Sequence, residues 1–240
     1  MISEIFISIQ GEGKKQGTLS LFIRFQGCNL RCKWCDTKYC SFPEHYNNSL
    51  SLEKALEKIK GLIKNKKIKN IVFTGGEPLL FQDEIVFLIK KIKEISKKEK
   101  LKANLEFEIE TNGTIELKKE FIPLLTKNDI FFNISPKPGH SQIKGFENKT
   151  FPKLIEQLMK LEEEMKKELF IVKFIVNNKK DKEFVFETIK KFEISNNKVF
   201  IQANCTDKEE CLKKGKELIE FCLENNFNFS SRLHLIFELK

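Results

Sequence analysis

The sequence contains no long hydrophobic run and no recognisable export signal. Its apolar stretches, such as Phe170–Val176, are interrupted by charge and are far shorter than the roughly 20 residues that span a membrane. The N-terminus lacks a basic stretch followed by an apolar run and a small-residue cleavage site. We therefore expect a cytoplasmic protein with no membrane partner. In a reducing cytoplasm, clustered cysteines more often serve metal binding or catalysis than disulfide formation.

Arginine-rich segments are missing as well, although the chain is basic. Lys and Arg together number 43 against 34 Asp and Glu, which gives a net charge of +9. The positive residues are nearly all lysines, and glutamates are mixed among them in the predicted helices at 53–67 and 84–100. Because nucleic-acid-binding proteins concentrate positive charge on one face, this mixed pattern favours a solvated lysine-rich surface. We expect no nucleic-acid partner.

Linkers, low-complexity tracts and sequence repeats are also absent. The 240 residues are 40% hydrophobic and 32% charged, which is typical of a globular protein. This length is ample for a hydrophobic core without disulfide support. We expect residues 1–240 to form a single domain.

Strand-like and helix-like patterns alternate along the chain. Strands are expected at residues 21–25, 70–73, 105–111, 130–135, 169–176 and 199–203, with a last strand from residue 227. Helices are expected at residues 52–63, 81–95, 117–126, 154–165, 185–192 and 206–223, the last with Thr206 and Glu209 at capping-box spacing. The alternation predicts an α/β fold with a parallel sheet. Since a complete barrel needs eight units and at most six are present, we predict an open, partial (β/α)6-type barrel. Two long loops, 37–49 and 136–151, are expected to be functional or flexible.

Three cysteines lie within eight residues, directly after the first predicted strand. Cys28, Cys32 and Cys35 have the spacing CxxxCxxC, and thiolates this close together can surround one soft metal centre. One interpretation is a 4Fe–4S cluster with three protein ligands and one iron open to another ligand. A second is a structural zinc site completed by Cys40 or His45. A third, ordinary buried thiols, conflicts with the charged residues that flank the triplet.

A glycine-rich turn, TGGEP at residues 74–78, follows the next predicted strand. Glycines allow a ligand to lie against the main chain, and a nearby carboxylate can accept hydrogen bonds. The triplet followed by GGEP about one βα unit later resembles the radical S-adenosylmethionine (SAM) superfamily. The resemblance implies a 4Fe–4S cluster on the three cysteines and SAM held by the backbone of the second motif.

Further motifs narrow the resemblance. They are SIQGEG at residues 8–13, RFQGCNLRC at 24–32, WCDT at 34–37, ETNGT at 110–114 and SPK at 135–137. Together they resemble the 7-carboxy-7-deazaguanine synthase family, over residues 4 to about 202. The resemblance implies conversion of 6-carboxy-5,6,7,8-tetrahydropterin to 7-carboxy-7-deazaguanine with loss of ammonia, on the queuosine pathway. In that family a 5′-deoxyadenosyl radical from SAM removes a hydrogen atom from C6 of the pterin.

The same resemblance assigns roles to individual residues. Arg24 would contact the substrate carboxylate, which suits a guanidinium fork, and Gln10 and Glu12 would read the pterin amide and amino groups. The substrate set is Ile9, Gln10, Gly11, Glu12, Arg24 and Thr74. The SAM set is Trp34, Cys35, Asp36, Gly76, Glu77, Ser135, Pro136, Lys137 and Gln202. The metal ligands are Cys28, Cys32 and Cys35 for the cluster and Thr37 for Mg²⁺.

One further acid, one amide and two departures from the family pattern complete this assignment. Glu110 and Asn112 are expected near the ribose or the substrate. Ala203 follows Gln202 where the family usually has proline, and the chain ends at Lys240 without the terminal proline that tends to contact substrate in the family.

The other cysteines and the histidines receive no role. Cys211 and Cys222 are expected to be core thiols, Cys205 follows a strand, and Cys40 is a loop residue. His140 and His234 are isolated. The resemblance implies a flavodoxin or ferredoxin as electron donor and a homodimer. Two alternatives remain open at this point: another small radical SAM enzyme, such as a glycyl-radical-enzyme activase, and a zinc-stabilised RNA-binding module.

Overall fold

The fold is an open barrel built on one eight-stranded sheet. A computed structural model describes residues 1–46, 49–65, 68–99, 105–127 and 129–239. The strands are β1 (Ile2–Ile9), β2 (Leu19–Phe25), β3 (Asn70–Gly75), β4 (Glu106–Thr111), β5 (Asp129–Ile134), β6 (Phe170–Val176), β7 (Val199–Ala203) and β8 (Asn228–Ser230). They lie side by side in chain order, with β1 antiparallel to β2 and the others parallel. The predicted α/β class and the open, partial barrel are confirmed, with β1 as an additional strand.

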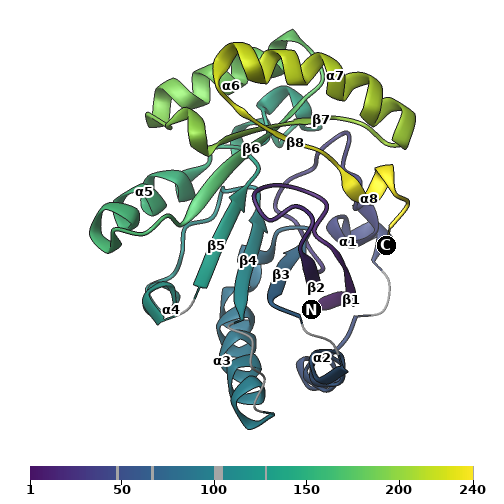
Figure 1. Cartoon of the computed structure of the whole chain (residues 1–240), viewed down its shortest axis with the longest axis vertical. Coiled ribbons are helices and arrows are strands. Elements are labelled where there is room, and N and C mark those ends of the chain that lie inside the picture. Colours follow the sequence, from purple (N-terminus) through teal and green to yellow (C-terminus); the bar gives the residue numbers. More distant parts are fainter. Residues whose placement is uncertain (47–48, 66–67, 100–104, 128, 240) are drawn as a thin grey trace.

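Helices α2 (Leu52–Asn65), α3 (Gln82–Lys98), α4 (Ile122–Lys127), α5 (Lys153–Met165), α6 (Lys179–Phe192) and α7 (Lys208–Asn225) lie on the outside of the strands (Figure 1). Two short helices, α1 (Lys38–Ser41) and α8 (Leu233–Ile236), contribute residues to the interior cavity. Within the described residues, no helix has the length and apolar character needed to cross a membrane.

Three local predictions need correction. The helix expected at 117–126 begins only at Ile122. The expected final strand is three residues long and is followed by the short helix α8. Helix α7 is capped by Asp207, whose side chain accepts from the Glu210 backbone N–H at 2.9 Å, so the expected capping box of Thr206 and Glu209 is wrong.

The two long loops contain short helical turns. The loop at 37–49 carries α1 and a 3₁₀ turn (Pro43–His45), and its residues 47–48 lie outside the described part of the chain. The loop at 136–151 carries two 3₁₀ turns, Gly139–Ser141 and Glu147–Lys149.

The alternation of residues along β2 separates the core from the barrel interior. Leu21, Ile23 and Phe25 are fully buried in the apolar layer between the sheet and the helices. Phe22 and Arg24 point the other way and border the central cavity. Successive side chains of a strand face opposite sides, so the outer face supplies stability and the inner face is free to carry polar groups. Each large side chain buried in the outer layer stabilises the fold by about 1.5–3 kcal/mol.

A disulfide joins the end of β7 to the first turn of α7. Cys205 and Cys211 are bonded, with their Cα atoms 5.1 Å apart. The expectation that Cys211 is a free core thiol is therefore wrong, whereas Cys222 is a buried free thiol as expected. The strand-to-helix turn brings the two residues together, and their sequence separation of six gives no pattern that distinguishes a bonded pair from two separate thiols.

Candidate active site

One cavity of about 410 Å³ lies inside the open barrel. Its walls come from the loop after β1, the cysteine loop after β2, the carboxyl ends of β3 to β7, and the segment around α8. In parallel α/β folds ligands bind at the carboxyl ends of the strands, and this volume is within the range of small-molecule sites.

The cysteine triplet forms one wall of this cavity. Cys28, Cys32 and Cys35 all border it and are all free thiols. A turn in which the Cys35 backbone N–H donates to the Cys32 carbonyl at 3.3 Å places the last two thiols. Burial raises the pKa of Cys28 to about 12, so binding of a metal centre by this thiolate must release its proton.

The loop at 136–151 braces the cysteine loop from outside. Gln142 is buried, accepts from the Arg31 backbone N–H at 3.0 Å and donates through Nε2 to the Cys32 Sγ at 3.2 Å. The Lys33 backbone N–H donates to the Ser141 carbonyl at 2.9 Å, and that of Ile143 to the Arg31 carbonyl at 3.0 Å. This loop therefore fixes the position of a predicted cluster ligand.

The glycines after β3 allow very close approach of the main chain. Gly75 has φ +139°, and a Cβ on Gly76 would lie 2.1 Å from the Gly27 carbonyl oxygen, just before the first cysteine. Any larger residue at position 76 would displace the cysteine loop. The backbone of this turn borders the cavity beside the triplet, where a ligand can lie against it.

Glu77, predicted to bind SAM, has its side chain outside the cavity. It is fully buried and accepts from the Thr111 hydroxyl at 2.7 Å and from the backbone N–H groups of Asn112 at 2.7 Å and Leu79 at 3.0 Å. Burial raises the pKa of Glu77 to about 7, against these hydrogen bonds. The carboxyl group thus ties the turn after β3 to the end of β4.

On the substrate side, Gln10 and Thr74 are connected to acids of β4. The Gln10 Nε2 donates to Glu108 at 2.9 Å and to Glu110 at 3.0 Å. The Thr74 hydroxyl donates to the other oxygen of Glu110 at 2.6 Å.

Arg24, from β2, donates through Nε to Glu4 at 2.8 Å, and its guanidinium lies 5.7 Å from the centre of the Phe6 ring in β1.

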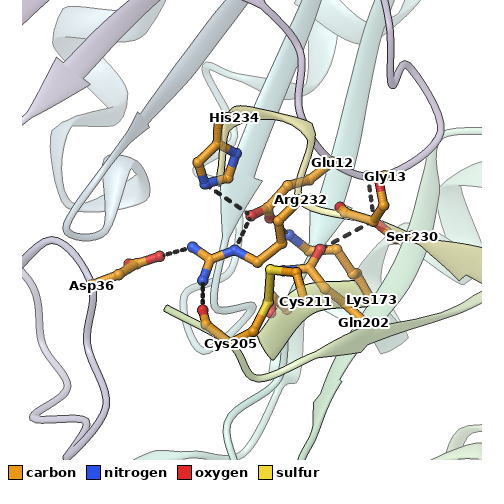
Figure 2. Close-up of polar contacts among 12 residues, drawn as sticks. Glu12, Gly13, Asp36, Lys173, Gln202, Cys205, Cys211, Ser230, Arg232 and His234 are labelled. Carbon is orange, nitrogen blue, oxygen red and sulfur yellow. Dashed lines mark hydrogen bonds and ion pairs between the residues drawn. A yellow bond between two sulfur atoms is a disulfide. The ribbon is translucent and has the colours of Figure 1, made fainter. Parts of the chain in front are cut away.

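Glu12 lies in a cluster of positive side chains, which Figure 2 shows. Lys173 pairs with one carboxylate oxygen and Arg232 Nε with the other at 3.0 Å, and His234 Nε2 is 3.9 Å away. Burial acts to raise the pKa of Glu12, but the charges of Lys173 and Arg232, joined by that of His234 when it is protonated, outweigh it and hold that pKa well below its usual range. Glu12 is therefore a carboxylate throughout the neutral range.

Arg232 also links the C-terminal segment to the cysteine loop. Its guanidinium pairs with Asp36 and donates to the Cys205 carbonyl at 2.6 Å (Figure 2). The Leu233 backbone N–H donates to the Gly11 carbonyl at 3.1 Å. Segments separated by more than 190 residues in sequence thus meet at one edge of the cavity.

On the side of β5, Lys137 donates to the Ser135 hydroxyl at 2.6 Å. Burial lowers the pKa of Lys137.

Thr37, the predicted Mg²⁺ ligand, has its hydroxyl 3.4 Å from that of Ser41 and 3.7 Å from the Cys35 Sγ.

The structure brings nearly all of the predicted site residues to this cavity. Those that border it are Ile9, Gln10, Gly11, Glu12, Arg24, Cys28, Cys32, Trp34, Cys35, Asp36, Thr37, Thr74, Gly76, Glu110, Asn112, Ser135, Lys137 and Gln202. Glu77 and Pro136 do not. Among the described residues, no three His, Cys, Asp or Glu side chains are grouped so that they could hold one metal ion.

Several residues at the cavity received no role from the sequence. Asn133, Lys173, Arg232 and His234 are four of them. A lone charge inside an otherwise apolar strand is a usable signal for Lys173. The other three have no local pattern that separates them from surface residues.

The chain matches known proteins along most of its length. Residues 22–201 match the model of the radical SAM superfamily. A 7-carboxy-7-deazaguanine synthase from Clostridium acetobutylicum is 37% identical over 81% of this chain and 76% of the relative, and one from Aquifex aeolicus is 33% identical over 100% and 94%. The crystal structure of QueE from Escherichia coli superposes with a TM-score of 0.63 at 22% identity, covering 95% of this chain and 92% of that one. The structure of anSMEcpe with bound AdoMet superposes with a TM-score of 0.60 at 18% identity, covering 87% and 62%.

Proposed function

The chain belongs to the 7-carboxy-7-deazaguanine synthase family of the radical SAM superfamily, and on that premise we propose how its own residues serve the reaction. The enzyme converts 6-carboxy-5,6,7,8-tetrahydropterin to 7-carboxy-7-deazaguanine with loss of ammonia, in queuosine biosynthesis. The observation that carries the residue assignments is the convergence of the three thiols, the Gly75–Gly76 turn and the Gln10–Glu12 loop on one cavity.

The donor set fits the expected cofactors. Cys28, Cys32 and Cys35 are free thiols on one wall, and three ligands leave one iron of a 4Fe–4S cluster for SAM. When bound, the cluster and SAM supply the electron and the radical that start the reaction. The main chain at Gly76, which a side chain would obstruct, and the polar groups of Ser135 and Lys137 would hold SAM beside the thiols.

The remaining residues bind and orient the substrate. Arg24 would receive the substrate carboxylate, and Glu12, held as an anion, would accept from the amino edge of the pterin. Each oxygen of Glu12 accepts one hydrogen bond, and a carboxylate oxygen can accept a second. The Thr74 hydroxyl gives its proton to Glu110 and therefore presents only an acceptor to the ligand. Thr37 offers a single hydroxyl to Mg²⁺, so we propose that substrate oxygens complete that metal site.

We further propose a flavodoxin- or ferredoxin-type electron donor, a homodimer, one domain covering residues 1–240, and a reducing cytoplasmic location. Five of the seven cysteines are free thiols, and three of them must stay reduced to bind iron, which supports a reducing environment. The relatives reported above are named as deazaguanine synthases and therefore do not support the alternative of a glycyl-radical-enzyme activase.

The direct test is an anaerobic assay of the purified, iron-loaded protein with SAM, a low-potential reductant, Mg²⁺ and carboxytetrahydropterin. We expect 7-carboxy-7-deazaguanine and ammonia to accumulate together with 5′-deoxyadenosine. Cleavage of SAM without consumption of the pterin would refute the substrate assignment and favour another radical SAM reaction.

Replacing Arg24 by alanine should raise the KM for the pterin by about 10- to 100-fold, because a hydrogen bond between charged groups contributes roughly 1.5–3 kcal/mol. Iron content should be unchanged. Arg31 is the matched control, since its guanidinium pairs with Glu44 at 2.9 Å and the residue does not border the cavity. Steady-state kinetics of the two alanine variants test this contact. An unchanged KM for the Arg24 variant would show that Arg24 does not bind the substrate carboxylate.

A further inference from the structure

The inner face of β4 carries a second carboxyl group besides Glu110, and this group lies deeper in the protein than the cavity wall. Glu108 is 0% exposed and does not border the cavity, whereas Glu110, two residues further along the same face, does. A carboxyl group this deeply buried needs a structural reason, because its transfer from water is costly unless it is hydrogen-bonded.

The contacts of Glu108 lead to the substrate-facing residues. Its Oε2 accepts from Gln10 Nε2 at 2.9 Å and from Asn70 Nδ2 at 3.1 Å. The second hydrogen of Gln10 Nε2 goes to Glu110 at 3.0 Å, and the Gln10 Oε1 accepts from the Glu12 backbone N–H at 3.2 Å. The carboxamide of Gln10 is thus held in one orientation by two acids on one side and a donor on the other.

The other oxygen of Glu108 has no partner. Within the described part of the chain, Oε1 is one of four buried side-chain atoms left without a hydrogen bond. Two of the others are both amide atoms of Asn133, which stands opposite Glu110 in the β4–β5 register. An unpartnered oxygen fits a protonated carboxyl group better than a carboxylate, because the neutral form costs less to bury.

The charges around Glu108 agree with this protonation. Burial raises its pKa, and the neighbouring Glu110 raises it too, while hydrogen bonds from Gln10 and Asn70 and the charge of Lys15 act in the opposite direction. These groups come from β3, β4 and the loop after β1.

One consequence concerns what the cavity wall presents to a ligand. The hydroxyl hydrogen of Thr74 and both amide hydrogens of Gln10 are directed to Glu108 and Glu110. The lone pairs that remain at Thr74 can only accept. This part of the wall is therefore suited to the N–H edge of a flat heterocycle and unsuited to its carbonyl edge.

We propose that Glu108 is a positioning residue for substrate recognition: without touching the ligand, it fixes the orientation of Gln10 and, with Glu110, makes this wall an acceptor surface for the donor edge of the pterin. The inference rests on the proposed function of the cavity. It assigns a role to a residue that lies outside every motif of the sequence.

The test compares Glu108→Leu and Glu108→Gln in the iron-loaded enzyme. Leucine removes the acceptor for Gln10, so the KM for the pterin should rise about tenfold with kcat changed by less than about threefold. Glutamine keeps a carbonyl oxygen for Gln10 and Asn70, so its KM at pH 7 should stay within about twofold of the parent. Glu162→Gln, at a largely buried acid that pairs with Lys198 at 2.6 Å and does not border the cavity, is the matched control and should leave KM unchanged.

A pH profile separates positioning from a purely structural role. The KM of the parent should change with pH as Glu108 ionises, and the profile of Glu108→Gln should be flatter, because the amide does not titrate. This readout remains decisive if the leucine variant fails to fold. Equal KM values for all variants, a glutamine variant as impaired as the leucine variant, or identical pH profiles would each overturn the proposal.

Failure of the proposed function has a different signature. In that case the unmodified enzyme itself does not consume the pterin, whereas formation of 5′-deoxyadenosine from SAM continues. Failure of the inference alone leaves the unmodified enzyme active and the variants indistinguishable from it in KM.

Discussion

Replacing Cys32 with alanine is expected to abolish turnover of the pterin, with a loss of at least about 10³-fold, and to lower bound iron from about four per chain to a small fraction of that value. The proposed cluster has only three protein ligands, and they lie on one short loop. With one ligand gone, two thiols must hold a cluster that is already open at one iron. Iron analysis and the visible absorption of anaerobically purified protein measure this without depending on activity.

Cys40 provides the matched control for this experiment. It lies five residues after Cys35 in α1, is fully buried, and its thiol donates to the Thr37 carbonyl at 3.3 Å. Its side chain does not border the cavity. Cys40→Ala should therefore keep its iron and turn over within about twofold of the parent. An iron-replete Cys32 variant would contradict the ligand assignment, and so would colourless parent protein containing one zinc per chain.

How far the sequence predicts the fold depends on how each strand is buried. The parallel strands were predictable because their outward faces carry unbroken sets of buried apolar residues, as Ile71 and Phe73 do in β3. Strand β1 was missed because it lies at one edge of the sheet and only Ile2 and Ile5 in it are fully buried. Helix α8 was missed because its position depends on a hydrogen bond to Gly11, a contact across more than 220 residues that local patterns do not report.

The site residues, like the strands and helices, fall into those that the sequence predicts and those that only tertiary contacts reveal. The residues of the motifs follow strand ends, and parallel strands bring all their carboxyl ends to one side of a barrel. Topology alone therefore gathers the cysteine loop, Thr74, Ser135 and Lys137 around one cavity. Arg232 comes from a tail without any motif, and only the three-dimensional structure shows that it joins Glu12 to Asp36. For Glu77 the motif predicts more than the structure shows. The motif lies at the cavity, but the Glu77 side chain accepts hydrogen bonds from Thr111 and Asn112 at the end of β4.

Replacing Lys173 with methionine should destabilise the protein by about 3 kcal/mol and also weaken substrate binding. Lys173 is 7% exposed and pairs with Glu12, which is 15% exposed. Methionine fills similar space without a charge. The loss in the free energy of unfolding therefore reports the cost of leaving the Glu12 carboxylate without its lysine partner, and not the cost of a cavity. Chemical denaturation gives the stability, and the KM for the pterin reports the position of Glu12.

Two comparisons show whether this loss comes from the Glu12 charge. Adding Glu12→Gln to the Lys173 variant should recover part of the lost stability but not the KM, so the two changes should not be additive in the free energy of unfolding. Lys198 is the matched control, because it pairs with Glu162 at 2.6 Å, is 16% exposed and lies away from the cavity. Lys198→Met should lower stability by about 1 kcal/mol with no change in KM. A Lys173 variant with the same behaviour would show that this ion pair is only structural.

The pH dependence of the Lys173 effect follows from the lowered pKa of Glu12. A carboxyl group whose pKa is lower in the folded than in the unfolded protein stabilises the fold above its unfolded pKa of about 4.5, and this contribution is lost as the pH falls. The parent should therefore lose stability below about pH 4.5, because the unfolded chain takes up a proton at Glu12 that the folded protein does not bind. The Lys173 variant has already lost much of that contribution, because removal of the lysine charge raises the pKa of Glu12 towards its ordinary value. The difference in unfolding free energy between the two proteins should accordingly be largest near pH 7 and shrink below about pH 4.5, and a difference that stays constant over this range would assign the loss to packing rather than to charge.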